Sequence, residues 1–519
     1  MKVIIVGGVA GGATAAARIR RLNEHAKITV FERSGYISYA NCGLPYYIGD
    51  VITDPEELTL QTPESFFKRF RINMKIHHEV ISIHPERKTV SVKNLENGEI
   101  FEENYDKLIL SPGGGFIGLE LAENLRELGM DVTIVQRPKQ LMNPFDPDMA
   151  SMIHNEMRKH GIKLVLGYTV EGFKEKDNGV EVLLKDNPSL QADMVVLAIG
   201  VTPDTVLAKE AGLELGIKES IVVNDRMETS VPDIYAAGDA VQVKHYVTGN
   251  DALISLAGPA NKQGRIIADN ICGGDSRYLG SQGSSVIKVF DMTAATTGIN
   301  ETNAKKSGLE VDTVILSPMS HAGYYPGGKV MTMKVVFEKE SYRLLGAQII
   351  GYEGVDKRID VLATAIHAGL NATQLKDLDL AYAPPYSSAK DPVNMAGFMI
   401  DNIAKGTLKQ WHLEDMDKIS KDKDVVLLDV RTVGEFSMGH IDGFKNIPVD
   451  ELREQISEIE KGKPVYLICQ SGLRSYIASR ILEGNGYETY NFSGGFRFYD
   501  AVVNDRALIE RAYACGMDY

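Results

Sequence analysis

The pattern of apolar and polar positions at the start of the chain predicts a strand, a tight turn and a helix. Residues 2–6 (KVIIV) contain four β-branched apolar residues in a row, residues 7–12 are rich in glycine, and an alanine-rich stretch with several arginines follows. A second apolar run, KITVFE at residues 27–32, predicts the next strand. A buried strand that leads through glycines into a helix is typical of a nucleotide-binding βα unit.

Similar patterns later in the chain divide it into several units. Alternating strand-like runs such as VMTMKVVF and LLGAQIIG predict a separate α+β unit between residues 284 and 403. A charged, weakly patterned stretch then precedes a buried apolar run at residues 425–428, and a strand, a loop and a helix follow at residues 463–482. The predicted domains are residues 1–112 together with 201–280, 113–200, 284–403 and 421–519, with a linker at 404–420.

Length and composition agree with several folded domains and narrow the choice of partners. The chain has 519 residues, whereas a domain usually contains ~100–200. Charged residues make up 24% and hydrophobic residues 44% of the chain, as in ordinary globular proteins. The net charge of -14 argues against nucleic acid as a partner.

Apolar runs and cysteines indicate the compartment. The chain contains no apolar run of about 18 residues, and a glycine interrupts the short apolar run at its start, so we expect neither a membrane span nor a signal peptide. The four cysteines are too few for a disulfide framework or a zinc site. We therefore expect a cytoplasmic protein without a metal, with working thiols at Cys42 and Cys469 and no role for Cys272 and Cys515.

The first glycine-rich turn partly matches the G-x-G-x-x-G motif of dinucleotide-binding proteins. Gly7 and Gly12 match, but Val9 takes the middle position, so the motif alone is only moderately specific. Glu32 ends the second strand twenty residues after Gly12, where a carboxylate accepts hydrogen bonds from a ribose. A glycine turn without a ligand would leave this acid unexplained, so the three features together predict a dinucleotide site.

A second motif indicates which dinucleotide binds. In DIYAAGDA (233–240) an apolar strand ends at Gly238 and Asp239, a position suited to binding a ribityl chain. The segment resembles the second FAD fingerprint of flavoproteins that bind two dinucleotides. This resemblance implies FAD, with Ala260 near the start of the next helix facing the flavin. The other cofactor-binding residues that it implies are Arg33 and Val80.

Cys42 lies in a short polar loop, SYANCGLPY (38–46). Ser38 and Asn41 are polar neighbours, and Gly43 lets backbone amides approach the sulfur, a setting that favours a thiolate. Most cysteines are instead buried and inert. The loop resembles the active-site loop of coenzyme A-disulfide reductases, which use one cysteine where glutathione-reductase-type enzymes use a pair. A single thiol cannot close an internal disulfide, so it would cycle through a mixed disulfide, a persulfide or a sulfenic acid.

A second nucleotide-binding motif begins directly after a strand that the first domain also needs. Gly113, Gly115 and Gly118 form a complete G-x-G-x-x-G before an amphipathic helix, as expected for a nicotinamide cofactor. In the family that the chain resembles, an extra segment supplies the strand before this motif, and that segment is missing here. Residues 108–112 would have to serve two sheets, although a strand of ~5–6 residues fills only one. Either one domain lacks a strand, or residues are absent from this sequence, or the chain is a deleted variant.

The choice between NADPH and NADH depends on the end of the next strand. Gln136 and Arg137 stand where NAD-specific sites usually carry an acid. Arg137 can pair with the 2′-phosphate of NADPH, and the alternative is a solvated arginine on a strand end. We expect NADPH rather than NADH.

The region between residues 284 and 403 resembles the dimerisation domain of the same enzymes. Tyr324 and Tyr382 lie in turn-like segments, where most tyrosines are packing residues with surface hydroxyls. The resemblance instead implies catalytic roles for both, with a phenol reaching Cys42 from the partner subunit of a homodimer. Coenzyme A carries phosphates, so its site needs positively charged side chains. Each candidate arginine or lysine is equally well explained as a solvated surface charge. The candidate substrate residues are Arg18, Arg20, Arg21, Ser38, Asn41, Lys68 and Arg69.

The last part of the chain matches the pattern of rhodanese domains. Asp429, Arg431 and Glu435 follow the first strand in the expected order. Cys469 opens the loop CQSGLRS between a strand and a helix, where loop amides point at the sulfur and Arg474 adds positive charge. An inert buried cysteine at a strand end is the alternative. The whole pattern favours a rhodanese-like α/β domain in which Cys469 carries sulfur.

Together these resemblances imply an α/β protein with two Rossmann-like domains, an α+β dimerisation domain and a rhodanese-like domain. They imply a FAD-dependent NAD(P)H oxidoreductase that reduces coenzyme A disulfide, or a coenzyme A persulfide or polysulfide, through Cys42. One alternative is an NADH oxidase or peroxidase in which Cys42 becomes a sulfenic acid. Another is a sulfur-binding or sensing protein whose reductase is inactive because of the missing segment.

Overall fold

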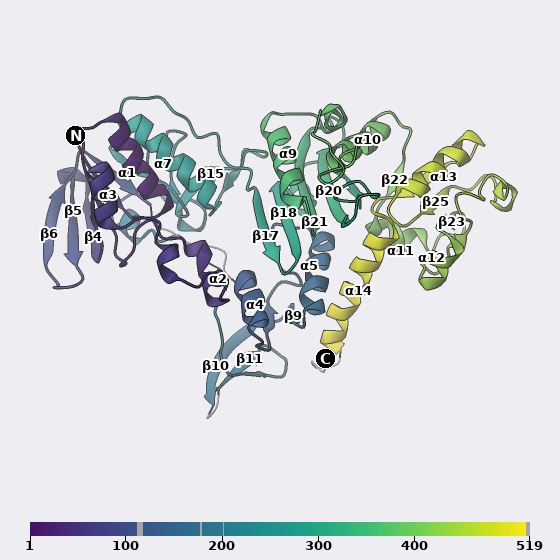
Figure 1. Ribbon diagram of the computed structural model, residues 1–519, viewed down its shortest axis with the longest axis horizontal. Helices are drawn as coiled ribbons and strands as arrows, with labels where there is room; N and C mark the ends of the chain where they lie inside the picture. The colour runs from purple at the N-terminus through teal and green to yellow at the C-terminus, as the bar shows by residue number, and fades with distance from the viewer. Residues whose placement is uncertain (112–117, 177–178, 201, 515–519) are drawn as a thin grey trace. The chain divides into compact units, whose positions relative to one another are not determined.

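A computed structural model describes residues 1–111, 118–176, 179–200 and 202–514 (Figure 1). Their contacts divide the chain into two compact units, Met1–Met130 with Val196–Gly283 and Asp131–Val195 with Ser284–Tyr519. The predicted site residues Gly113 and Gly115, and also Cys515, lie outside the described residues. Among the residues described, no helix combines the length and the apolar composition that crossing a membrane requires.

The first unit is built on a five-stranded parallel sheet whose central strands are largely apolar and buried. Helices α1 (Ala10–Leu22) and α7 (Ala257–Ile271) pack against each other so closely that a Cβ on Gly264 would lie 2.3 Å from the carbonyl oxygen of Gly11. The predicted strand, turn and helix at the start of the chain are thus confirmed. In order across the sheet the strands are β14 (Ile234–Ala236), β7 (Lys107–Leu110), β1 (Lys2–Val6), β2 (Lys27–Phe31) and β3 (Asn73–Lys75).

Smaller elements complete this unit. One antiparallel sheet contains β4 (His78–His84), β5 (Thr89–Asn94) and β6 (Ile100–Asn104). Another contains β13 (Ile221–Val222), β15 (Val241–Lys244) and β16 (Asp251–Ala252). The remaining helices are α2 (Leu44–Ile48), α3 (Pro63–Phe70), α4 (Gly118–Glu127) and α6 (Val206–Glu210).

Strand β7 belongs to the sheet of the first unit and has both edges filled. Leu108 and Leu110 pair with β1 on one side and with β14 on the other. The apolar run VVLAIGVTP at residues 195–203 predicts a strand that returns from the second nucleotide-binding domain, but its described residues form no strand. Leu197 and Ile199 in this run are exposed. That prediction was wrong, because the strand with which this run would pair is already used in the other sheet.

The part of the second unit before residue 196 has two small sheets. Strands β8 (Thr133–Gln136) and β9 (Lys163–Leu166) pair in parallel, and α5 (Pro147–Lys159) connects them. An antiparallel sheet follows, with β10 (Val170–Lys176), β11 (Gly179–Leu184) and β12 (Leu190–Ala192). The predicted strand after the second glycine motif is present as β8, in a sheet of two strands among the residues described.

The region between residues 284 and 403 forms the predicted α+β unit. A five-stranded antiparallel sheet has helices packed on it, and the runs VMTMKVVF and LLGAQIIG lie at its centre, where nearly all their side chains are buried. In order, the strands are β17 (Ser285–Val289), β18 (Met292–Gly298), β21 (Leu344–Gly351), β20 (Met331–Glu338) and β19 (Val311–Leu316). The helices are α8 (Glu301–Lys306), α9 (Val355–His367) and α10 (Pro392–Ala404).

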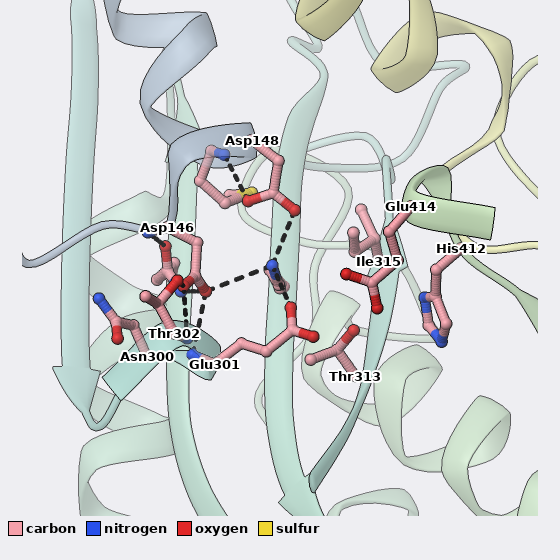
Figure 2. A network of polar contacts seen from close by, with 12 residues as sticks. Asp146, Asp148, Asn300, Glu301, Thr302, Thr313, Ile315, His412 and Glu414 are labelled. Atoms are coloured by element: carbon pink, nitrogen blue, oxygen red, sulfur yellow. Dashed lines mark hydrogen bonds and ion pairs between the residues drawn. The ribbon is translucent and has the colours of Figure 1, made fainter. Parts of the chain in front are cut away.

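A buried ion cluster ties this sheet to the chain around α5 (Figure 2). Lys334 of β20 is 1% exposed, and its Nζ lies 2.7 Å from Asp148, 2.7 Å from Glu301 and 3.2 Å from Asp146. Burial alone would lower the pKa of Lys334, but the three carboxylates outweigh burial and raise the pKa above its ordinary value. The cluster therefore holds a charged lysine inside the second unit.

The C-terminal domain has a five-stranded parallel sheet flanked by helices, as predicted. Its strands in order are β22 (Gln410–Trp411), β26 (Thr489–Phe492), β25 (Val465–Ile468), β23 (Val426–Asp429) and β24 (Lys445–Asn446). Its helices are α11 (Met416–Ile419), α12 (Val433–Met438), α13 (Leu473–Gly484) and α14 (Gly495–Ala514).

The sheet starts inside the segment that the sequence predicts as a linker, residues 404–420. Trp411 is 2% exposed on strand β22, and its indole N–H donates to the carbonyl oxygen of Leu467 at 3.3 Å. His412 Nε2 lies 3.0 Å from Asp312 Oδ1, which joins this edge to β19. From Gln410 onward the segment is therefore part of the folded domain, which corrects the linker prediction.

Candidate functional site

The turn between β1 and α1 has the close backbone packing that a dinucleotide cradle needs. Gly7 has a φ of 101°, and a Cβ on Gly12 would lie 2.0 Å from the carbonyl oxygen of Gly7. Glu32 follows β2, and its carboxylate accepts hydrogen bonds from the backbone N–H groups of Gly8 at 2.8 Å and Ser34 at 2.9 Å. The structure thus brings the predicted glycines and the predicted acid to one turn, and these residues fit a bound FAD.

The second predicted FAD segment is held against α7. Gly238 has a φ of 88°, and its N–H donates to Gln263 Oε1 at 2.7 Å. Gln263 is 1% exposed and lies one turn after Ala260 on α7. Gln263 has a role that sequence reasoning missed, because a glutamine within a helix has no motif of its own. The segment of Gly238 and Asp239 is therefore fixed at the end of β14, where a flavin chain would pass.

Two other predicted cofactor residues have different surroundings. Arg33 follows Glu32, and its Nη1 lies 3.1 Å from Asp204 Oδ2, with both side chains exposed. Val80 is 4% exposed within β4. Of the two, only Arg33 presents a polar group at the surface of this unit.

The loop of Cys42 is tied to the dinucleotide turn by its backbone. Cys42 is exposed and lies in the 3-10 turn Asn41–Gly43, directly before α2. The N–H of Ser38 donates to the carbonyl oxygen of Gly8 at 2.9 Å, and Ser38 has a φ of 46°. An exposed thiol is thus fixed next to the cradle that fits FAD.

Helix α4 packs against α2 beside this loop, a contact that the sequence did not predict. The hydroxyl of Tyr46 on α2 donates to Glu120 Oε1 on α4 at 3.4 Å. Burial, followed by the charge of Glu120, raises the pKa of Tyr46 to about 12, and burial also raises the pKa of Glu120. A protonated phenol therefore lies one turn after Cys42.

Some of the candidate cations for coenzyme A already make hydrogen bonds within the protein, and the others are exposed. Arg18 Nε donates to Asp269 Oδ1 at 2.8 Å. Arg20 is 7% exposed and donates to five backbone carbonyl groups, so it is structural and its prediction was wrong. Lys68 and Arg69 are exposed in the last turn of α3. Arg21 is exposed at the end of α1, and so is Asn41 beside Cys42.

The described residues do not complete a fold for a nicotinamide cofactor. Gly118 begins α4, and Arg137 is exposed directly after β8. A nucleotide-binding βα unit needs a strand that runs into its glycine turn. Strand β7 precedes this turn but is paired on both sides in the other sheet, so the described residues give this βα unit no strand of its own.

The structure brings the two predicted tyrosines of the second unit together. The hydroxyls of Tyr324 and Tyr382 are 2.7 Å apart, although the residues lie on different loops. Tyr324 follows β19, and Tyr382 precedes α10. The hydrogen bond with Tyr324 raises the pKa of Tyr382 above its ordinary value. Both side chains are exposed, at 76% and 46%.

Cys469 is buried at the end of β25 and is surrounded by hydrogen-bond donors. Its side chain is 1% exposed. The N–H of Gly472 and the hydroxyl of Ser475 both donate to Sγ at 3.1 Å. Gly472 has a φ of 101° and caps α13, a conformation that favours glycine. The predicted loop amide is confirmed, and Ser475 is a further donor that the last letter of CQSGLRS could have indicated.

Charged residues next to Cys469 form tight pairs. Arg474 makes two hydrogen bonds to Glu435, both at 2.7 Å. These bonds lower the pKa of Glu435 to about 2. Arg431 is 2% exposed, contacts Asp429 at 2.7 Å and stacks over the ring of Phe496 at 3.8 Å. The guanidinium of Arg474 is thus directed at Glu435, a partner whose contact with it the sequence did not predict.

Comparisons with known families agree with this division of the chain. Residues 1–114 and 111–264 match the family described as pyridine nucleotide-disulphide oxidoreductase. Residues 284–392 match the dimerisation domain of the same family, and residues 412–501 match the rhodanese-like domain. The first two matches overlap at 111–114, the place where one strand precedes both nucleotide-binding regions.

Similar proteins cover most of the chain. Coenzyme A disulfide reductase of Staphylococcus aureus (strain JH9) is 35% identical over 439 residues, which cover 76% of this chain and 99% of the relative. The crystal structure of reduced Bacillus anthracis CoADR-RHD has a TM-score of 0.94 and 44% identity, covering 97% of this chain and 98% of that one. A NAD-dependent persulfide reductase from A. fulgidus has a TM-score of 0.90 and 36% identity, covering 96% and 100%.

These matches confirm the predicted mixed α/β fold with Rossmann-type, dimerisation and rhodanese-like domains. They also imply FAD and NAD(P)H as the cofactors of the family. The chain therefore belongs to the pyridine nucleotide-disulphide oxidoreductase family, as an enzyme related to coenzyme A disulfide and persulfide reductases that carries a rhodanese-like domain.

Proposed function

We propose that this protein reduces the sulfur–sulfur bond of coenzyme A disulfide, or of a coenzyme A persulfide or polysulfide, at Cys42. The observation that carries the proposal is the tie between the Cys42 loop and the dinucleotide turn, made by the N–H of Ser38 and the carbonyl oxygen of Gly8. An exposed thiol at that place is accessible to a substrate from solvent. The names of the similar reductases support the choice of substrate.

The chemistry requires one thiol and two electrons. The thiolate of Cys42 attacks one substrate sulfur, so that a mixed disulfide forms and the other sulfur leaves as a thiolate that takes up a proton. When bound, FAD supplies a two-electron redox centre. Two electrons and one proton then convert the mixed disulfide into the Cys42 thiolate and free coenzyme A thiol. With a persulfide as substrate, the sulfur that leaves in the end is sulfide.

Tyr324 and Tyr382 are proposed to supply the proton for the leaving thiolate from the partner subunit of a homodimer. The short distance between their hydroxyls and the match to a dimerisation domain support this role. We expect Tyr382→Phe to lower the rate of thiol release about 10- to 100-fold, because general acid catalysis by one group contributes at least that much. Stopped-flow detection of released thiol measures this rate, and an unchanged rate would rule out the role.

Cys469 is proposed to accept sulfane sulfur and to pass it to or from coenzyme A. The two donors at its sulfur support a thiolate that can carry a persulfide. All three described cysteines, Cys42, Cys272 and Cys469, are free thiols, which agrees with the proposal of a reducing compartment such as the cytoplasm.

The choice of electron donor depends on residues 111–118, where the strand of the first domain leads directly into the second glycine motif. Because Arg137 follows β8, we propose that NADPH is used in preference to NADH. Because β7 is filled on both sides, we expect NADPH to bleach the flavin slowly in anaerobic titration, whereas dithionite bleaches it fully. Rapid bleaching of the flavin by stoichiometric NADPH would contradict the expectation that the nicotinamide site is impaired by the lack of its own strand. An unchanged nucleotide preference in Arg137→Ala would exclude that residue.

The same titration addresses the alternatives. If dithionite bleaches the bound FAD but neither NADPH nor NADH does, the result would favour a sulfur-binding protein with an inactive reductase. For the oxidase or peroxidase alternative, the dithionite-reduced protein is mixed with peroxide or with coenzyme A persulfide. Faster oxidation by peroxide would favour a sulfenic acid at Cys42.

A further inference from the structure

A buried arginine connects the two loops that carry the tyrosine pair. Arg358 lies on α9 and is 1% exposed. Its Nη2 donates to the carbonyl oxygen of Ser320 at 2.9 Å and contacts that of Tyr386 at 3.3 Å. Ser320 is on the loop of Tyr324, and Tyr386 is on the loop of Tyr382. One nitrogen atom therefore links both loops.

The charge of Arg358 is balanced by one carboxylate at the start of α10. Its Nε and Nη2 lie 3.2 Å and 3.0 Å from Asp391 Oδ2. The hydroxyl of Ser387 accepts from Nη2 at 3.1 Å and donates to the same carboxylate oxygen at 2.7 Å. Asp391 is 3% exposed, and its other oxygen accepts from the N–H of Val393. Because a buried charge is costly without its partners, this network has little freedom to rearrange.

Two further contacts fix the position of the guanidinium and of the loops. Nη1 donates to the carbonyl oxygen of Gly354 at 3.1 Å, and a Cβ at this glycine would lie 2.1 Å from Nη1. The N–H of Ala322 donates to the carbonyl oxygen of Ser387 at 3.0 Å, which joins the loops directly. The guanidinium thus has neighbours on α9, on both loops and at the start of α10.

The tyrosine rings themselves have little packing to hold them. Tyr324 and Tyr382 are 76% and 46% exposed, and yet their hydroxyls are 2.7 Å apart. Because packing on the rings does little to fix them, whether the two hydroxyls can meet depends on where the loop backbones place the two side chains. We propose that Arg358 is the positioning residue that holds the two loops in register and keeps the tyrosine pair together. Its catalytic consequence rests on the proposed function, whereas its effect on the loops does not.

The test compares Arg358→Lys, Tyr382→Phe and the double variant. A lysine keeps the charge but lacks the fork of donors that reaches Ser320, Tyr386 and Asp391 together. The FAD-loaded protein is reduced with dithionite and mixed with coenzyme A disulfide, and the rate of thiol release is measured without any nucleotide. We expect Arg358→Lys to lower this rate about tenfold in the natural background and less than about twofold in the Tyr382→Phe background.

A matched control separates positioning from general loss of stability. Lys334→Arg is also a charge-conserving exchange in a buried ion cluster, but that cluster contacts Asp146, Asp148 and Glu301 and neither tyrosine loop. Its effect is expected to be the same with and without Tyr382→Phe. Sulfur transfer at Cys469, measured with thiosulfate and cyanide, should stay unchanged in every variant.

Hydrogen exchange gives a result that does not depend on activity. We expect the amide of Ala322 to exchange about tenfold faster in Arg358→Lys and at an unchanged rate in Lys334→Arg. The proposal would be overturned if Arg358→Lys lowered the rate of thiol release by the same factor with and without Tyr382→Phe. It would also be overturned if the exchange rate of the Ala322 amide stayed unchanged in Arg358→Lys. If Tyr382→Phe alone keeps the full rate of thiol release, the proposed role of the tyrosines fails, and exchange still decides whether Arg358 holds the loops.

Ser387→Ala covers the case in which Arg358→Lys does not fold. This change removes only the hydroxyl that lies between the guanidinium and Asp391. A smaller effect in the same direction, about two- to fivefold on thiol release, is expected, because the two hydrogen bonds of this hydroxyl are lost while the direct contact between Arg358 and Asp391 remains. No change in either rate or exchange would again overturn the proposal.

Discussion

Cys42 and Cys469 differ in burial and in the origin of their hydrogen-bond donors. Cys42 is exposed in a short 3-10 turn, and its loop is fixed to the cofactor cradle through Ser38. Cys469 is 1% exposed, and its two donors come from its own loop and the helix that follows. An exposed sulfur is suited to a bulky substrate and a redox cofactor, whereas a buried sulfur with two donors from its own loop and helix is stabilised locally. The proposed role of the first site depends on groups outside its own loop, and that of the second does not.

The use of a single strand before residue 112 affects the two sites unequally. Strand β7 completes the sheet of the Cys42 unit, and the nucleotide-binding region after it has a sheet of two strands in the part of the chain that the structure describes. The C-terminal sheet has its full set of five parallel strands. In the proposed function, electron supply to Cys42 is therefore the vulnerable step, and the proposed sulfur transfer at Cys469 is independent of it.

The largest expected effect comes from removing each sulfur in turn. We expect Cys469→Ser to lower sulfur transfer from thiosulfate to cyanide by about 10³-fold or more and to leave thiol release from coenzyme A disulfide unchanged. Cys42→Ser should do the opposite, because its loop is part of the other unit. The two assays on both variants form the test. Loss of both activities in either variant would show that the sites work as one relay.

A smaller effect is expected from the hydroxyl of Ser475. The reacting form of a cysteine is the thiolate, and a hydrogen bond to a charged group is worth about 1.5–3 kcal/mol, so Ser475→Ala should lower sulfur transfer about 10- to 100-fold. Ser479→Ala is the matched control, because Ser479 is buried on the same helix but donates to the carbonyl oxygen of Tyr476. If both variants lost sulfur transfer to the same extent, the effect would come from helix stability. The hydroxyl of Ser475 would then no longer distinguish the Cys469 site from the Cys42 site.

Much of this comparison could be predicted from local sequence. Strands β1 and β25 come from short apolar runs, β20 and β21 come from alternating strand-like runs, and the turns around Gly7 and Cys469 come from glycine and cysteine motifs. The conflict at residues 108–112 was also predictable, because the number of strands can be counted along the chain. What could be predicted depends on patterns that extend over a few neighbouring residues.

The rest depends on contacts between distant segments. Tyr46 meets Glu120 across 74 residues, and Arg358 joins two loops that no motif relates. Strand β22 has two residues, too few for a periodic pattern, and its edge position follows from pairing with β26. The apolar run after residue 195 shows the converse. Local preference for a strand has no effect when the neighbouring strand is absent.

The smallest expected effect concerns the ion pair of Glu435 and Arg474, and it tests whether the Cys469 site is stabilised by its own residues. The pKa of Glu435 is lowered to about 2 by Arg474, so the pair contributes stability that is complete above the unfolded-state value of ~4.3 and is lost as pH falls toward about 2. Glu435→Gln should therefore lower the stability of this domain at pH 7 and make progressively less difference below about pH 4. The pair is about one-third exposed, so the loss at pH 7 should stay below about 1 kcal/mol.

Trp411, the only tryptophan of the chain, is buried in the C-terminal sheet, so its fluorescence during urea unfolding reports on that domain alone. Glu460→Gln is the control, because Glu460 is 63% exposed and its pair with Lys463 should contribute little. A loss for Glu435→Gln that persists unchanged at pH 3 would mean that the carboxylate acts through packing rather than charge. The donors around Cys469 would then be held by the loop alone, and the contrast with the Cys42 site would rest on Gly472 and Ser475.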